Sequence, residues 1–181
     1  MDMKATPAGP SSNVKDLRAR ARKQIEDGAV TDVYGADREA VLKLLNEALA
    51  TEIVCVLRYR RHHFMAKGIN AEPIAAEFLV HAGEELAHAD SIAARIVQLG
   101  GEPDFAPDTL SARSHSEYVA VNSLTEMIKE NLVAERVAIE SYSDMIRYIS
   151  DKDITTRRLL EGILAVEEEH ADELADMLPQ R

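Results

Sequence analysis

Residues 84–90 read EELAHAD and residues 167–174 read EEEHADEL, so each stretch places a glutamate three positions before a histidine. On a helix, residues three apart share a face, and each stretch therefore offers one carboxylate beside one imidazole. A lone glutamate precedes each pair by about one helical hairpin, at Glu52 and at Glu135. The whole set consists of Glu52, Glu85, His88, Glu135, Glu167 and His170. Four carboxylates and two imidazoles suit a pair of divalent metal ions.

Spacing alone is weak evidence for such a site, because 32 of the 181 residues are Asp or Glu and one such pair would arise by accident. The stronger evidence is periodicity. Four long segments carry apolar residues at the three-and-four spacing of helices that face a core, and members of the six-residue set interrupt each stripe near its middle. An isolated buried carboxylate is too costly to keep charged unless it is paired or metal-bound. Four interruptions at matching depth therefore favour a metal site.

The same periodicity predicts four long helices, with ends marked by capping signals. Asn70 is the expected N-cap of the second helix, and Ser114-x-x-Glu117 is the expected capping box of the third. The predicted helices span residues 37–67, 71–99, 114–150 and 153–178.

The lengths of the loops between these helices predict the topology. The loops after the first and third predicted helices are only a few residues long, so each must connect two antiparallel helices as a hairpin. The middle loop, residues 101–115, contains Pro103 and Pro107, and its apolar residues do not follow helical spacing. Its extended length of roughly 50 Å exceeds the length of a 30-residue helix, about 45 Å. One long crossover between two hairpins is the ferritin-like form of the all-α four-helix bundle.

Two regions are expected along the chain. Residues 1–35 form an N-terminal extension, and residues 36–181 form the bundle domain. Within the extension, residues 1–13 are rich in Pro, Gly and Ser and predict a mobile tail. Residues 14–27 predict a short basic helix, and residues 28–35 link it to the bundle.

Composition limits the classes of protein. Apolar residues make up 46% of the chain but aromatic residues only 4%, which suits packed aliphatic helices. No apolar run is long enough to span a membrane, and the start lacks the apolar region of a signal peptide. A single cysteine leaves no internal disulfide and favours the cytoplasm. The net charge of −11 argues against general nucleic-acid affinity and attracts cations.

The quoted stretches, together with LNEALATE at residues 45–52, resemble those of bacterioferritins in the ferritin-like superfamily, over about residues 37–178. The resemblance implies a di-iron site in which Glu52 and Glu135 are terminal ligands and Glu85 and Glu167 bridge the metals. It also implies that His88 and His170 each bind one iron, and that Tyr59 lies beside the site.

Other features depart from the bacterioferritin pattern. The position of the methionine that binds haem in bacterioferritins is occupied by Leu86, so haem binding is not expected. The sequence ends at Arg181, soon after the fourth predicted helix, without a fifth helix, and it carries an N-terminal extension. Both features are similar to those of Dps-type mini-ferritins, and they favour a dodecameric shell of identical subunits over a 24-subunit one.

By this resemblance the expected function is that of a ferroxidase, which oxidises Fe(II) with O2 or H2O2 and stores Fe(III) in a shell. Two iron ions per subunit are expected, with Mn or Zn as possible substitutes. One alternative is a Dps-like DNA-binding protein, because residues 1–25 hold six Lys or Arg against two Asp. The same segment could instead dock on a neighbouring subunit. Another alternative keeps the site but makes the protein a di-iron or di-manganese peroxidase or oxidase.

Several neighbouring residues stay open at this stage. His81, four positions before Glu85, is either a partner of the site or a histidine of the core. Cys55 is expected to be a small buried apolar residue. The remaining acids and histidines near the stripes are expected at the surface: Glu84, Glu168, Glu169, His62, His63 and His115.

Overall fold

The computed structural model describes residues 13–178, and the chain divides into two compact units between Tyr34 and Gly35. The first unit contains α1 (Val14–Arg20) and a short 3-10 turn (Ile25–Asp27). The predicted helix over residues 14–27 is therefore helical only in its first half. Helix α1 ends at Arg20, and Gln24 then adopts a left-handed conformation, with φ of 46°, just before the 3-10 turn. The predicted tail, residues 1–13, lies outside the described residues except for Asn13, whose side chain caps α1.

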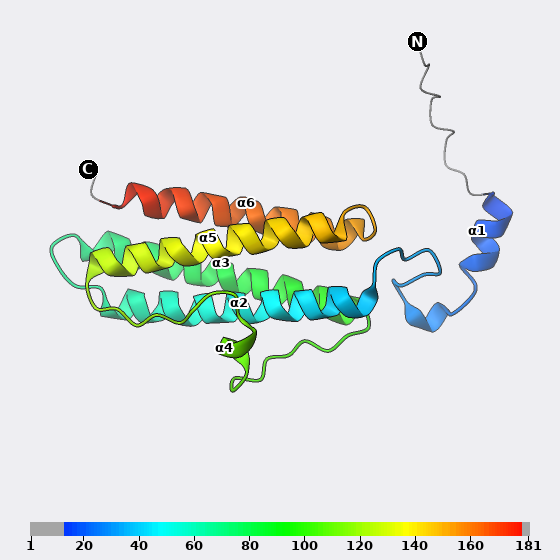
Figure 1. The fold of residues 1–181 in the computed structure, drawn as a ribbon, viewed down its shortest axis with the longest axis horizontal. Helices are drawn as coiled ribbons and strands as arrows, with labels where there is room; N and C mark the ends of the chain where they lie inside the picture. Colours follow the sequence, from blue (N-terminus) through cyan, green and yellow to red (C-terminus); the bar gives the residue numbers. More distant parts are fainter. Residues whose placement is uncertain (1–12, 179–181) are drawn as a thin grey trace, which may run out of the picture. The chain divides into compact units, whose positions relative to one another are not determined.

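The second unit is the predicted crossover bundle, in which four long helices lie side by side (Figure 1). Helix α2 packs mainly on α3, and α5 packs mainly on α6. The crossover after α3 carries the short helix α4 (Leu110–Arg113) and runs beside α2. The long helices are α2 (Arg38–Met65), α3 (Ala71–Gln98), α5 (Leu124–Ile149) and α6 (Ile154–Asp176). The all-helical fold expected from the sequence is confirmed.

Side-chain caps fix the starts of three long helices. Asp37 accepts from the backbone N of Ala40 at 3.2 Å at the start of α2. Asp153 accepts from the backbone N of Thr156 at 2.9 Å at the start of α6. Such caps satisfy amide groups that have no partner within the helix. Asn70 precedes α3 as predicted, but its side chain makes no capping hydrogen bond.

The predicted start of the third helix at Ser114 is wrong, because α5 begins only at Leu124. The Ser114 hydroxyl bonds the backbone of Ser116 instead of capping a helix. The cap is Ser123, whose hydroxyl accepts from the backbone N of Glu126 at 3.2 Å. The sequence thus holds two Ser-x-x-Glu patterns, and only the second starts a helix.

Residues between α4 and α5 remain extended because polar groups of α2 satisfy their backbone. Arg58 Nη1 donates to the carbonyl of Glu117 at 3.0 Å, and Arg61 Nη1 donates to that of Val121 at 2.7 Å. An extended residue covers about 3.3 Å, more than twice its rise in a helix. The extended segment thus lets the crossover return along the bundle.

The bundle core is largely apolar, and a buried ion pair lies near one end. On α5 the buried face includes Met127, Ala134, Ala138 and Met145, while several larger residues of the predicted stripe are only partly buried. Near the start of α6, Arg95 Nη2 contacts both carboxylate oxygens of Asp153, at 2.9 and 3.0 Å. None of the helices within residues 13–178 is long and apolar enough to cross a membrane.

Candidate metal centre

All six residues selected from the sequence meet at mid-bundle, one or two from each long helix. Glu52 comes from α2, Glu135 from α5, and the two Glu-x-x-His pairs from α3 and α6. Five of the side chains are at most 2% exposed, and the His88 side chain is 11% exposed. The set is therefore enclosed by the bundle.

The six side chains form two overlapping groups. In each group, one candidate ligand atom per residue lies within 4.8 Å of the others. The first group contains Glu52 and His88, the second contains Glu135 and His170, and both contain Glu85 and Glu167. Two adjacent metal positions with two shared carboxylates would have this geometry.

Buried polar atoms without hydrogen-bond partners lie at this same cluster of side chains. Oxygen atoms of all four glutamates are buried without a hydrogen-bond partner among the described residues, and so is Nδ1 of His170. Buried polar groups are normally hydrogen-bonded, because each unpaired group costs about 1–3 kcal/mol and a charged group costs more. Their convergence fits divalent cations, which accept electron pairs from oxygen and nitrogen.

Two buried tyrosines connect the halves of this centre. Tyr59 on α2 donates a hydrogen bond to Glu135 on α5, and Tyr142 on α5 donates one to Glu52 on α2. Each hairpin thus orients the lone glutamate of the other hairpin. Burial, followed by the nearby carboxylates, raises the pKa of both phenols well above the usual value, so the hydroxyls keep their protons.

The sequence predicts Tyr59 beside the site, but the position of Tyr142 was not predicted. The sequence nevertheless contains a spacing that indicates the position of Tyr142. Tyr59 follows Glu52 by seven positions, and Tyr142 follows Glu135 by the same interval. Seven residues are about two helical turns, so each tyrosine shares a face with the glutamate before it.

Without metal, the centre retains protons. Burial raises the pKa of Glu85 well above its usual value, and the charges of Glu167 and Glu52 raise it further. Burial and the charge of Glu52 likewise raise the pKa of Glu167. Protons thus reduce the repulsion among carboxylates that metal ions would otherwise offset.

The two histidines differ in charge. Burial disfavours the charged ring of His88, but Glu52 and Glu85 outweigh burial and raise its pKa to about 10. Its Nδ1 lies 3.4 Å from Glu52 and 3.2 Å from Glu85. Burial and the nearby His81 lower the pKa of His170, so this ring favours the neutral form that binds metals.

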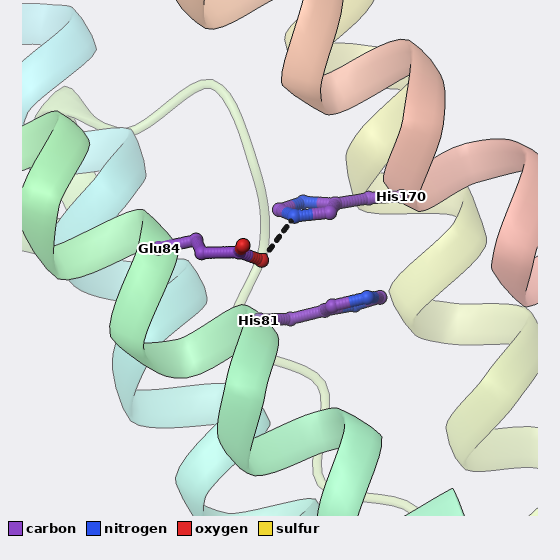
Figure 2. A group of neighbouring side chains, drawn as sticks. All are labelled: His81, Glu84 and His170. Atoms are coloured by element: carbon purple, nitrogen blue, oxygen red, sulfur yellow. Dashed lines mark hydrogen bonds and ion pairs between the residues drawn. The ribbon is translucent and has the colours of Figure 1, made fainter.

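The expected surface position of Glu84 is confirmed, but this residue also contacts the centre. Its side chain is 48% exposed, yet it accepts a hydrogen bond at 2.8 Å from Nε2 of His170 (Figure 2). A proton held on Nε2 leaves the lone pair of Nδ1 directed at Glu135 and Glu167, at 3.9 and 3.8 Å. Glu84 therefore sets the tautomer in which His170 can bind a metal.

His81 and Cys55, left open by the sequence, both lie close to the centre. The ring of His81 stacks on that of His170 with 4.0 Å between centroids, and its Nδ1 is 3.2 Å from the Tyr59 hydroxyl. Cys55 is 3% exposed and lies 3.7 Å from Arg58 Nη2. Burial raises the pKa of its thiol, which disfavours the reactive thiolate.

The surface assignment of His62 is wrong, because its side chain is fully buried. Its Nδ1 lies 2.9 Å from Asn131 Oδ1, to which Arg58 Nε also donates at 3.1 Å. Burial lowers the pKa of His62 to about 4, so the ring is neutral beside the Arg58 guanidinium. His115 is exposed, as expected, and His63 is partly exposed; each lies near a polar group.

The crossover topology and the enclosed carboxylate–histidine cluster define the class as that of ferritin-like four-helix bundles. The chain belongs to the ferritin family: residues 42–180 match the family model for the ferritin-like domain.

Known relatives agree with this assignment. A bacterioferritin of Desulfovibrio desulfuricans is 29% identical over 136 residues, which cover 74% of this chain and 72% of the relative. Its structure, described as containing a diiron site, has a TM-score of 0.69 at 26% identity and covers 77% of this chain and 78% of that one.

Two other relatives differ from the bacterioferritins in their descriptions. A dodecameric thioferritin, the bacterioferritin-related protein of Bacteroides fragilis, has a TM-score of 0.75 at 30% identity, covering 78% of this chain and 86% of that one. A nutrient stress-induced DNA-binding protein of Synechococcus is 31% identical over 137 residues, 74% of this chain and 78% of the relative.

Proposed function

We propose that this protein is a ferroxidase that binds two Fe(II) ions per subunit and stores the oxidised iron in a shell of identical subunits. The observation that carries the proposal is the convergence of buried, unpartnered oxygen and nitrogen atoms at mid-bundle. Such atoms are costly in a structure without cations and favourable in one that binds them.

The proposed roles follow from the two overlapping groups. Glu85 and Glu167 would bridge the two metal ions, since both groups contain them, and Glu52 and Glu135 would be terminal ligands. His88 and His170 each complete one metal position. Tyr59 and Tyr142 orient the terminal carboxylates and keep their protons. Mn(II) and Zn(II) suit the same donors and would substitute in binding.

In the reaction, two Fe(II) ions each lose one electron and become Fe(III). The acceptor is either O2, which also takes up two protons and becomes H2O2, or H2O2, whose O–O bond breaks to give two hydroxide ions. The residues bind the substrate ions side by side, so a two-electron acceptor can react with both. His88 and the raised-pKa carboxyls release protons when the ions bind. Oxygen ligands then favour the more highly charged product.

The test is an anaerobic titration of the full chain with Fe(II), followed by air and sizing of the product. We expect about two Fe(II) per subunit, rapid oxidation, and a soluble iron-containing assembly, by the ligand count of such sites. Glu52→Ala and Glu135→Ala should abolish rapid oxidation. Glu39→Ala and Glu140→Ala are matched controls, because both residues are exposed on the same helices. Binding far below two equivalents would overturn the proposal.

For the assembly, we propose a dodecamer within the cytoplasm. The support for the dodecamer is the description of the Bacteroides fragilis neighbour. The single cysteine suits a reducing compartment. A mass near twelve subunits on light scattering would agree, whereas a monomer or dimer would favour the peroxidase or oxidase alternative, since storage needs a shell.

A second candidate function is DNA binding, favoured by the description of the Synechococcus relative. Among the described residues, Lys15, Arg18, Arg22 and Lys23 are exposed. Contacts of such side chains with phosphates weaken as salt rises. A gel shift at two salt concentrations, with and without residues 1–25, tests this role. Equal mobility of DNA with both chains at low salt would exclude it.

A further inference from the structure

A cavity of about 240 Å³ lies between α2, α5 and the crossover, and its lining contains none of the six candidate metal ligands. The apolar part of the lining includes Val119, Val133 and Val137. The polar part includes Arg58 from α2 and Ser116 from the crossover, and both side chains are buried. The cavity therefore offers apolar contacts together with buried hydrogen-bonding groups.

The buried Arg58 carries a positive charge that is not neutralised by a carboxylate. Its side chain is 1% exposed, and it forms no ion pair within residues 13–178. Arg58 donates to two neutral oxygen atoms, Asn131 Oδ1 at 3.1 Å and the Glu117 carbonyl at 3.0 Å. Its third contact is with Cys55 Sγ at 3.7 Å. A guanidinium has five N–H groups, so these three contacts leave two without a partner. A buried charge without a counterion is costly, and an anion in the cavity would offset that cost.

Ser116 provides a second unpaired donor beside the same cavity. Its side chain is 3% exposed, and its hydroxyl has no hydrogen-bond partner among the described residues. Buried hydroxyl groups are normally hydrogen-bonded. The Ser114 hydroxyl bonds the backbone of Ser116, which holds this residue in place and leaves its own hydroxyl available. One ligand oxygen can accept from this hydroxyl while another accepts from Arg58.

Two glutamates restrict the charge of the ligand. Glu117 is exposed, Glu130 is partly exposed, and both line the cavity. Their carboxylates would repel a ligand that carries more than one negative charge. The cavity is also smaller than the pockets of roughly 300 Å³ or more that hold drug-sized ligands. These features favour a small anion with one negative charge and an apolar part.

We propose that this cavity binds a small aliphatic monocarboxylate. The carboxylate accepts charge-assisted hydrogen bonds from Arg58 and a hydrogen bond from Ser116. The apolar chain packs against Val133 and Val137. Because these residues belong to α2, the crossover and α5, the bound ligand fastens the crossover to both helices. Binding does not depend on the proposed ferroxidase function, since no candidate metal ligand takes part.

The test uses butyrate as the probe and the metal-free full chain, because carboxylates also bind metal ions. Titration calorimetry measures the affinity and the number of ligands per subunit. Ser116→Ala removes one donor and leaves the hydrogen bonds of Arg58 intact, and Glu130→Gln removes one negative charge from the lining. Ser91→Ala and Glu140→Gln make the same changes at exposed positions outside the cavity. In crystals, 4-bromobutyrate is located by the anomalous scattering of bromine.

We expect about one butyrate per subunit. Ser116→Ala should weaken binding about tenfold, since it removes a hydrogen bond to a charged group. Glu130→Gln should bind butyrate more tightly than the wild type, an effect that damage to the fold would not produce. Succinate and phosphate should bind more weakly than butyrate, because they carry more charge. The bromine peak should lie beside Val133 and Val137.

Three results would overturn the inference. The first is an absence of butyrate binding, which would show that water or the Glu130 side chain satisfies Arg58. The second is equal affinity of Ser116→Ala and Ser91→Ala, or a bromine peak elsewhere. The third is tighter binding of phosphate than of butyrate, which would contradict the proposed class of ligand.

Discussion

The hydroxyl of Tyr142 on α5 donates a hydrogen bond to the carboxylate of Glu52 on α2, across the interface between the two hairpins. Glu52 is 2% exposed, and its second oxygen has no hydrogen-bond partner among the described residues. The tyrosine therefore fixes one oxygen of Glu52 and leaves the other available for a metal.

Replacing Tyr142 with phenylalanine should weaken metal binding without unfolding the bundle. Loss of a group that orients a ligand typically lowers metal affinity about 10–100-fold. The hydrogen bond to a carboxylate contributes about 1.5–3 kcal/mol, so the free energy of unfolding should also decrease. Zinc titration and chemical denaturation measure the two effects. Tyr148→Phe is the control, because Tyr148 is 52% exposed; equal affinities of the two variants would contradict the role of Tyr142.

Glu84→Ala should lower metal affinity, although Glu84 is not expected to bind a metal of the dinuclear centre. Without its carboxylate, the proton of His170 is free to move to Nδ1, which removes the lone pair that faces Glu135. We expect an affinity loss of about 10-fold or more. Glu84→Gln should recover part of it, since the amide oxygen still accepts from Nε2. If Glu84→Ala and the control Glu168→Ala bind zinc with equal affinity, Glu84 does not set the tautomer of His170.

The metal-free protein should lose stability as pH rises from 7 to 9. His88 has a folded pKa of about 10, above its unfolded value of 6.5, so its contribution is complete below pH 6.5 and is lost toward pH 10. The raised pKa values of Glu85 and Glu167 act in the same direction, because the folded state holds protons that the unfolded state has released. Thermal unfolding in EDTA at several pH values measures the slope. A midpoint that rises across this range would contradict these protonation states.

Glu85→Gln should stabilise the metal-free protein at pH 8 and abolish most of the stabilisation by metal. A neutral amide removes one of four crowded acids, whereas metal binding needs its charge. For the wild type, Zn²⁺ at 100 times its dissociation constant should add about 2.7 kcal/mol to the free energy of unfolding. Calorimetry with EDTA or Zn²⁺ compares the proteins, with Glu168→Gln as the control. If Zn²⁺ raises the free energy of unfolding of Glu85→Gln as much as that of the wild type, Glu85 is not a ligand.

The fold and the six-residue set were accessible from the sequence because both depend on helical periodicity. Glu52, Glu85 and Glu167 interrupt apolar stripes, and a buried acid needs a partner whatever the details of packing. The wrong start at Ser114 had a different cause. Ser114 and Ser123 each begin a Ser-x-x-Glu pattern, and the choice between them depends on contacts from Arg58 and Arg61 that are distant in sequence.

Residues that act through a second side chain were harder to predict. Glu84 lies beside a candidate ligand in the sequence, but its contact with His170 arises only when α3 packs on α6. The burial of His62 likewise depends on Asn131 from another helix. Tyr142 differs from these, because the seven-residue interval from Glu135 was visible and repeats that of Glu52 and Tyr59.

The exchange of tyrosine contacts between hairpins also bears on how the protein is made. A growing chain that contains only α2 and α3 has Tyr59 but lacks its acceptor, Glu135. It also has Glu52 but lacks the donor to that carboxylate, Tyr142. Under the proposed function, iron would therefore find no complete binding site on an unfinished polypeptide. Its oxidation would begin only after both hairpins have docked.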